Sequence, residues 1–251
     1  MPEMVQIGNE IIGGMLWPDG KISIGGWSNL ADLINAGIAG VDAGRGAEPM
    51  PEIMIQIDRG GDQSSTKWFF NNLLAQGVEF DVIGQSFYPQ WHGTLDDLTA
   101  NLNFMAANYS QDIIVVETGE YYTSGGATPE GQKAFLEELI LRVQATPYGK
   151  GRGVCYWEPT WVWSSPVGWK ALFEPDPDWD DVNMLMGMEA FDKIYGDMTG
   201  NGIVDYEDLP GFLGYWLQTD CNDPGNLDLN DDCIINFHEF SVLAQNWRQE
   251  Q

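Results

Sequence analysis

Short apolar runs alternate with amphipathic segments over the first 195 residues. The runs have the length of strands and cover residues 4–8, 53–57, 80–86, 113–117 and 153–157. The segments between them place apolar residues at helical spacing, over 28–36, 66–76, 95–108 and 129–145. A strand, a polar or glycine-rich loop and a helix, repeated in that order, predict parallel βα units. The nearly continuous apolar character of the strands predicts a sheet covered on both faces. The expected fold class is therefore α/β.

The excess of acidic residues argues against two classes of function. The chain has 11 Lys and Arg against 38 Asp and Glu, a formal net charge of −27. Such an acidic chain lacks the basic surface that nucleic acids and anionic membranes require. No apolar run reaches the ~18 residues of a membrane-spanning helix, and no signal-peptide pattern is visible. Neutral polymers or cations are the expected partners, and 11 Trp residues fit either sugar-stacking surfaces or core positions.

Composition changes near residue 195. Residues 196–251 contain 11 acidic residues and a single base, Arg248, in clusters rich in Asp, Asn and Gly. We therefore predict two domains, over residues 1–195 and 196–251.

Chemically active side chains follow the predicted strands. In parallel α/β folds the functional residues lie at the carboxyl ends of strands. Those ends carry Asn9, Glu10, Asp58, Tyr88, Trp91, His92, Glu117 and Trp157. Two glutamates that each follow an apolar strand suggest the paired carboxylates of a retaining glycosidase. The alternative is that each glutamate only caps the helix that follows it.

Four stretches then resemble a known family. They are VQIGNEIIGGMLWPDG (5–20), TKWFFNNLLAQGVEFDVIGQSFYPQWHGTLDDLTANLNFMA (66–106), IIVVETGEYYT (113–123) and GVCYWEPTWV (153–162). They are similar to glycoside hydrolase family 53, the endo-β-1,4-galactanases, which are retaining enzymes with a (β/α)₈ barrel. The resemblance implies that Glu10, after the fourth strand, is the acid/base and that Glu117, on the seventh, is the nucleophile. Glu10 then has to stay protonated near neutral pH while Glu117 stays ionised.

The same resemblance implies roles for the substrate-binding residues. Asn9 would hydrogen-bond the 2-hydroxyl of the sugar that is cleaved, and Tyr88 would donate to the nucleophile. Trp157 would form the platform under that sugar. We expect Trp91 and His92 to line the cleft, with packing as the alternative. Asp58 belongs to a fifth-strand motif in which the family usually has His where this chain has Gln56.

The resemblance does not extend to the first three strands of the family. At the observed spacing an eight-unit barrel takes roughly 310 residues, so about three units are missing. We expect a partial (β/α)₈ TIM barrel, strands four to eight only, from a longer gene product, because an open half-barrel exposes strand edges and core.

Two segments of the tail repeat at an offset of 31 residues. Oxygen-bearing side chains occupy positions 1, 3, 5, 9 and 12 of each segment, and position 7 offers a backbone carbonyl, as in a Ca²⁺ loop. The predicted ligands are Asp197, Thr199, Asn201, Ile203, Asp205 and Asp208 in the first loop, and Asp228, Asn230, Asp232, Ile234, Asn236 and Glu239 in the second. The repeat resembles a dockerin, a small all-α calcium-binding module, which implies a cohesin-type partner; a purely structural calcium module is the alternative.

Three cysteines allow one pair and one remaining thiol. Cys233 stands where the first loop has Gly202, in a turn that favours a left-handed backbone. A Cys221–Cys233 disulfide would hold it there, which favours an oxidising compartment; otherwise the second loop binds calcium weakly. Cys155 is expected to be a buried thiol.

The leading interpretation is a secreted or cell-surface endo-β-1,4-galactanase that acts on the type I arabinogalactan side chains of pectin. Ca²⁺ would serve the tail only, and catalysis would need no cofactor. The alternatives are an inactive fragment that acts only through its calcium-dependent tail, and a related glycosidase with another specificity, such as a mannanase or a cellulase.

Overall fold

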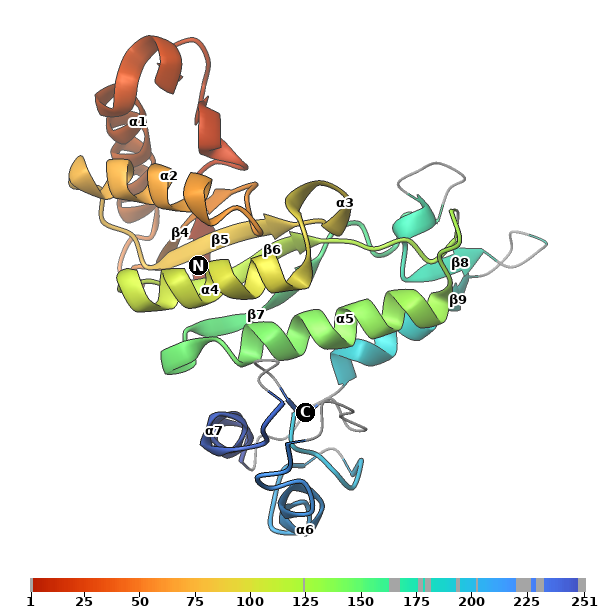
Figure 1. Cartoon of the computed structure of the whole chain (residues 1–251). Coiled ribbons are helices and arrows are strands. Elements are labelled where there is room, and N and C mark those ends of the chain that lie inside the picture. Colours follow the sequence, from red (N-terminus) through yellow and green to blue (C-terminus); the bar gives the residue numbers. More distant parts are fainter. Residues whose placement is uncertain are drawn as a thin grey trace. The chain divides into compact units, whose positions relative to one another are not determined.

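The computed structural model describes residues 2–123, 125–162, 168–175, 178, 182–192, 195–201, 203–219, 227–228 and 233–247. The chain forms two compact units (Figure 1). The first consists of Met1–Thr118 and Lys150–Cys155, and the second of Gly119–Gly149 and Tyr156–Gln251.

A five-stranded sheet is the centre of the first unit. Its order is β1–β4–β5–β6–β7, and the pairings of β1 with β4, β4 with β5 and β5 with β6 are parallel. The strands are β1 (Met4–Gln6), β4 (Glu52–Ile57), β5 (Val82–Phe87), β6 (Asp112–Thr118) and β7 (Gly151–Tyr156). Every residue of β5 is buried, including the polar Gln85 and Ser86. The α/β prediction is confirmed, and the sheet is open, with β1 and β7 at its edges.

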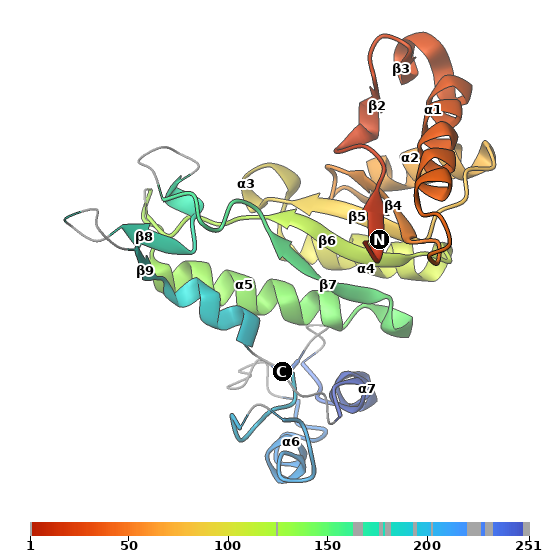
Figure 2. The same cartoon turned by 180° about the vertical axis from the view of Figure 1, so that it is seen from behind.

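Helices connect the strands of the first unit (Figures 1 and 2). They are α1 (Ile22–Gly44), α2 (Gln63–Ala75), α3 (Pro89–His92) and α4 (Leu95–Asn108). A short 3-10 helix, η1 (Ile11–Gly13), and a small hairpin of β2 (Gly14–Met15) with β3 (Gly20–Lys21) precede α1. Fully buried Phe69, Phe70 and Leu73 of α2 and Leu98 of α4 belong to the core.

The second unit contains α5 (Pro129–Gln144) and the tail. Its other elements are the 3-10 helices η2 (Pro147–Gly149), η3 (Gly168–Lys170) and η4 (Met186–Asp192), the antiparallel pair β8 (Phe173–Pro175) and β9 (Val182–Met184), and the helices α6 (Leu209–Leu213) and α7 (Phe237–Gln245). α5 packs against η4.

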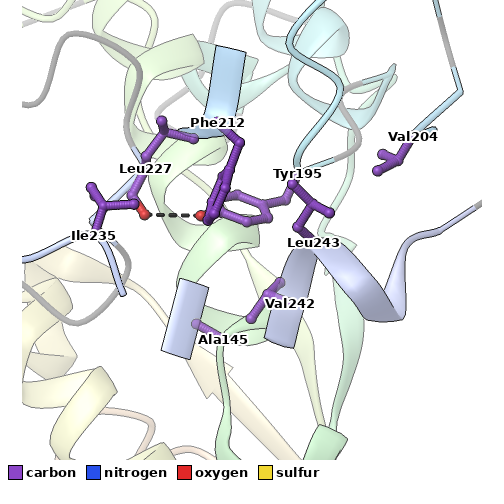
Figure 3. Close-up of a cluster of buried hydrophobic side chains, with 8 residues drawn as sticks. All are labelled: Ala145, Tyr195, Val204, Phe212, Leu227, Ile235, Val242 and Leu243. Atoms are coloured by element: carbon purple, nitrogen blue, oxygen red, sulfur yellow. Dashed lines mark hydrogen bonds between the residues drawn. The ribbon is translucent and has the colours of Figure 1, made fainter. Parts of the chain in front are cut away.

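The tail shares its core with residues that precede it. Phe212 of α6 and Leu243 of α7 pack in one buried cluster with Ala145 and Tyr195 (Figure 3). The Tyr195 hydroxyl donates a hydrogen bond of 2.9 Å to the carbonyl oxygen of Leu227. The tail therefore buries apolar surface contributed by residues outside 196–251. The domain boundary after residue 195 stays a prediction.

One expectation about the fold is wrong. Cys155 is a free and exposed thiol, not a buried one. It lies on β7, an edge strand in which every residue is either exposed or of intermediate burial. Among the described residues, no helix has both the length and the apolarity needed to cross a membrane.

Candidate active site

The turn after β1 presents Asn9 and Glu10. Gly8 adopts a φ of 79°, and a Cβ there would lie 2.6 Å from Cγ2 of Ile11, so only glycine fits. Glu10 itself is left-handed, with φ 49° and ψ 51°, a conformation that costs a non-glycine residue roughly 1–2 kcal/mol. The Asn9 Oδ1 accepts a hydrogen bond of 3.2 Å from Gln6 Nε2. Strain of this kind is retained where the surrounding structure enforces it.

Gln56 of β4 supplies part of that enforcement. Its side chain is fully buried, and its Oε1 accepts from the backbone N–H of Glu10 at 2.7 Å and from Gln6 Nε2 at 3.1 Å. Its Nε2 donates to the hydroxyl of Ser86 at 2.6 Å. The side chain of Gln56, which stands where the family usually has His, thus connects β1, the turn after it and β5.

A bulge aligns Ser86 with Glu117. The parallel register of β5 on β6 pairs Gln85 with Val115 and then shifts, so that Ser86 pairs with Glu117. A bulge re-aims the side chains that follow it. Without the shift, Val116 would stand opposite Ser86.

The Ser86 hydroxyl lies between the two carboxylates. Its Oγ is 2.8 Å from Glu10 Oε1 and 3.2 Å from Glu117 Oε2. The distance between the nearest carboxylate oxygens of the two glutamates therefore cannot exceed the sum of these two distances. This closeness is compatible with the roughly 5–5.5 Å between the carboxyl groups of retaining glycosidases. The predicted pairing of Glu10 with Glu117 in one site is thus present in the geometry.

The environment affects the ionisation of Glu117. Burial raises the pKa of Glu117 above its ordinary value, and the negative charge of Glu10 adds to the rise. Hydrogen bonds from Ser86 and Gln56 oppose it without cancelling it.

Helix α3 carries an aromatic group beside these residues. The buried Tyr88 ring meets the rings of Trp91 and His92 edge-on, with centroids 5.4 and 5.9 Å away. Trp91 is 68% exposed, which leaves its surface open to a ligand. Burial lowers the pKa of His92, and the charge of Asp58 opposes this only in part. His92 Nδ1 accepts from the Tyr88 N–H at 3.1 Å, so the neutral ring carries its proton on Nε2.

Asp58 lies directly after β4. Its carboxylate is 3.8 Å from the Arg59 guanidinium. Its Oδ1 is buried and has no hydrogen-bond partner among the described residues. The remaining predicted binding residue, Trp157, is partly exposed and belongs to the second unit.

Comparison with known proteins identifies the family of this chain. The model of glycosyl hydrolase family 53 matches residues 1–201. The chain belongs to this family. An uncharacterized protein in the bgaB 5′ region of Niallia circulans is 40% identical over 187 residues, which cover 64% of this chain and 50% of that protein. Arabinogalactan endo-β-1,4-galactanase A of Aspergillus niger is 34% identical over 211 residues, 76% of this chain and 59% of that enzyme.

A solved structure shows the shared fold. One from a study of two fungal β-1,4-galactanases has a TM-score of 0.68 at 30% identity, covering 77% of this chain and 62% of that one. The open parallel sheet with its helices therefore corresponds to part of a family 53 (β/α)₈ barrel. The chain spans about half to three fifths of the length of the curated relatives it matches.

The first loop of the tail gathers oxygen atoms. The Thr199 hydroxyl lies 3.3 Å from Asp197 Oδ1 and 3.1 Å from Asp208 Oδ1, so positions 1, 3 and 12 meet. Asn201 Oδ1 accepts from the N–H of Ile203, and Asp205 Oδ1 from that of Glu207. Among the described residues, no group of three or more His, Cys, Asp or Glu side chains is arranged to hold a metal ion.

The second loop is described only in part. Asn230, Asp232 and Cys221 lie outside the described residues. Cys233 has a φ of 63°, the left-handed conformation predicted for its position, and its N–H donates to Asp228 Oδ2 at 2.7 Å. Asn236 and Glu239 form a capping box at the start of α7. The capping box gives these two residues a structural role that needs no metal.

Sequence reasoning missed two members of the site. Gln6 lies inside the predicted run 4–8, and Ser86, the last residue of the run 80–86, is neither a carboxylate nor a sugar-stacking aromatic residue, so neither was identified. Ser86 occupies an inward position within β5 and is fully buried. The available signal was a polar residue, Gln or Ser, at inward-facing positions of otherwise apolar strands, since buried polar groups need specific partners.

Proposed function

We propose that this protein is a retaining endo-β-1,4-galactanase that cleaves the galactan side chains of pectin. The observation that carries the proposal is the pair Glu10 and Glu117, both within hydrogen-bond distance of the Ser86 hydroxyl. Membership of family 53 and the relatives named arabinogalactan endo-β-1,4-galactanase support the substrate class.

Each glutamate then has a role in a double displacement. Glu10 protonates the leaving oxygen while Glu117 attacks the anomeric carbon and forms a glycosyl ester. Glu10 next takes a proton from water, whose oxygen attacks the same carbon and releases Glu117. Asn9, Asp58, Tyr88, Trp91, His92 and Trp157 are proposed to bind the sugars. No step needs a cofactor.

We further propose that catalysis requires a closed barrel. The edges β1 and β7 leave the sheet open, and an open edge is prone to pair with other chains. Retaining catalysis tolerates little loosening of its geometry, since about 1 Å of misplacement costs roughly 10²-fold in rate. The 251-residue chain alone is therefore expected to aggregate and to hydrolyse galactan poorly.

Release of reducing sugar from potato galactan tests both proposals. The chain is compared with a form joined to the first three βα units of a family 53 relative, and mannan and cellulose serve as parallel substrates. We expect activity on galactan from the joined form, and none after Glu117→Gln in that form. Preference for mannan or cellulose would refute the galactanase specificity. Equal turnover by the short chain would refute the need for closure.

For the tail we propose a dockerin-like module that binds Ca²⁺ and presents a surface to a cohesin-type protein. The donor set of the first loop consists of oxygens, which suit Ca²⁺, and Asp197, Thr199 and Asp208 already converge. Asn201, Ile203 and Asp205 would complete it, and the second loop would use Asp228, Asn230, Asp232, Ile234, Asn236 and Glu239. We propose that a Cys221–Cys233 disulfide holds the second loop and that the protein is secreted or displayed on the cell surface.

A further inference from the structure

The orientation of the Gln56 amide is determined by its neighbours. One end of the amide lies 2.7 Å from the backbone nitrogen of Glu10. A backbone N–H can only donate, so the end that faces it has to be the carbonyl oxygen. The NH₂ end is therefore directed to Ser86 Oγ, 2.6 Å away.

This orientation constrains the proton of Ser86. Because Oγ accepts from Gln56, its own proton has to be donated elsewhere. Two acceptors lie within reach, Glu10 Oε1 at 2.8 Å and Glu117 Oε2 at 3.2 Å. A hydroxyl has one proton, so it serves one carboxylate at a time. Ser86 and Gln56 are both fully buried, so the geometry of this donor is fixed within the sheet.

We propose that Ser86 is a positioning residue whose hydrogen bond moves between Glu117 and Glu10, following the negative charge. The proposal rests on the double displacement under Proposed function. Before the first step Glu117 is the carboxylate and receives the bond. Once Glu117 has formed the ester and Glu10 has lost its proton to the leaving oxygen, Glu10 is the carboxylate and receives it. Hydrogen bonds to a charged acceptor are about twice as strong as neutral ones, so the hydroxyl rotates with the charge and keeps its own proton throughout.

The other ionisable groups around the pair do not share this role. His92 of α3 interacts electrostatically with Glu10. Asp58 and Arg59, which follow β4, also affect the pKa of His92. Gln56 does not titrate. Ser86 is thus the group among the described contacts that lies within hydrogen-bond distance of both carboxylates.

Carboxyl titrations test the proposal without a substrate. The form joined to the first three βα units of a family 53 relative is labelled with ¹³C at the glutamate side-chain carboxyls, and the Glu10 and Glu117 signals are followed against pH. Glu117→Gln isolates the titration of Glu10, and Glu10→Gln isolates that of Glu117. Ser86→Ala is added to each background. A hydrogen bond to a carboxylate favours the charged form, so we expect its loss to raise the midpoint by about one pH unit in both backgrounds.

Two further variants separate donation from packing. Ser86→Thr keeps a hydroxyl and should restore the parent midpoints, whereas Ser86→Cys keeps the size with a weak donor and should shift both midpoints upward by less than Ser86→Ala. A midpoint shift in one background alone would show a fixed bond and overturn the proposal, as would no shift in either. Because no galactan is present, absent hydrolysis by the closed barrel would refute the proposed function and leave this result standing.

Discussion

The amide oxygen of Gln56 lies 2.7 Å from the backbone nitrogen of Glu10. The fully buried side chain of Gln56 on β4 thereby holds the left-handed turn that follows β1. The same amide fixes Ser86, which lies across from Glu117 because of the bulge in β5 and β6. The position of each carboxylate therefore depends on polar groups inside the sheet, in addition to the strand that carries it.

Replacement of Gln56 by Met should destabilise the protein. The substitution keeps the length of the side chain but leaves the N–H of Glu10 and the hydroxyl of Ser86 without this partner. Groups that lose a buried partner cost about 1–3 kcal/mol. Urea denaturation of the wild type and the variant, both in the form joined to the first three βα units, measures the difference in the free energy of unfolding.

Gln85 of β5 provides the matched control. It is as buried as Gln56, but its Nε2 makes only long contacts, 3.4 Å to Thr66 Oγ1 and 3.4 Å to the sulfur of Met105. Its Oε1 has no hydrogen-bond partner among the described residues. Gln85→Met should therefore be neutral or stabilising. Equal losses from both substitutions would contradict a specific role for Gln56.

The raised pKa of Glu117 predicts a pH-dependent effect of Glu117→Gln. A carboxyl with a raised pKa binds its proton more tightly in the folded state than in the unfolded state, so the stability from that protonation is lost as the pH rises through the folded value. Above that pH the wild type carries a half-buried negative charge at Glu117, beside Glu10, which the variant lacks.

Glu117→Gln should consequently be more stable than the wild type at pH 8, and the difference should shrink towards zero below the ordinary value of 4.5. Urea denaturation at pH 4 and pH 8 measures it. The conservative control is Glu48→Gln, an exposed glutamate in the same unit, which should show no such trend. A variant less stable than the wild type at pH 8 would disprove the assigned cause.

The apolar pattern predicted the elements but not the site network. The helix over 95–108 has the predicted bounds, and the five strands lie within two residues of the predicted ends. The first helix, by contrast, begins at Ile22, six residues earlier than predicted, and continues through a kink at Gly26. Glycines lowered its apparent helical propensity, and tertiary packing outweighed that cost.

The contacts of Ser86 and Gln56 could not be predicted from spacing. They depend on which strands are neighbours and on a one-residue register shift, and both are properties of strand pairing. The resemblance located Glu10 and Glu117 at strand ends, because these positions belong to local motifs. A side chain within a strand has no such local signal.

Ca²⁺ should stabilise the chain if the tail loops bind it. A ligand that binds only the folded state adds RT ln(1 + [L]/Kd), about 2.7 kcal/mol at 100 times Kd. The whole chain is the right sample, since Ala145 and Tyr195 complete the core of the tail. Thermal denaturation with Ca²⁺, with Mg²⁺ and with chelator should show the highest Tm in the presence of Ca²⁺.

Asp197→Ala should remove the part of that rise that comes from the first loop, and Asp228→Ala the part from the second. Glu207→Ala, a neighbouring acidic residue outside the proposed ligand set, is the control for loss of charge. If Ca²⁺ leaves the Tm unchanged and calorimetry detects no binding, the loops have only the capping roles that the structure displays.

Gly61 lies so close to the backbone of α3 that it leaves no room for a side chain. A Cβ at Gly61 would lie 1.8 Å from the carbonyl oxygen of His92, a backbone atom that cannot move without displacing α3. Gly61→Ala should therefore shift the helix that carries Trp91 and His92 and should destabilise the chain by roughly 1–3 kcal/mol. Gly40→Ala is the control, because its Cβ meets nothing within 4 Å inside α1; there alanine should stabilise by up to about 1 kcal/mol. Urea denaturation gives both values. A loss of stability in Gly40→Ala as large as that in Gly61→Ala would show that the close contact with His92 is not the cause.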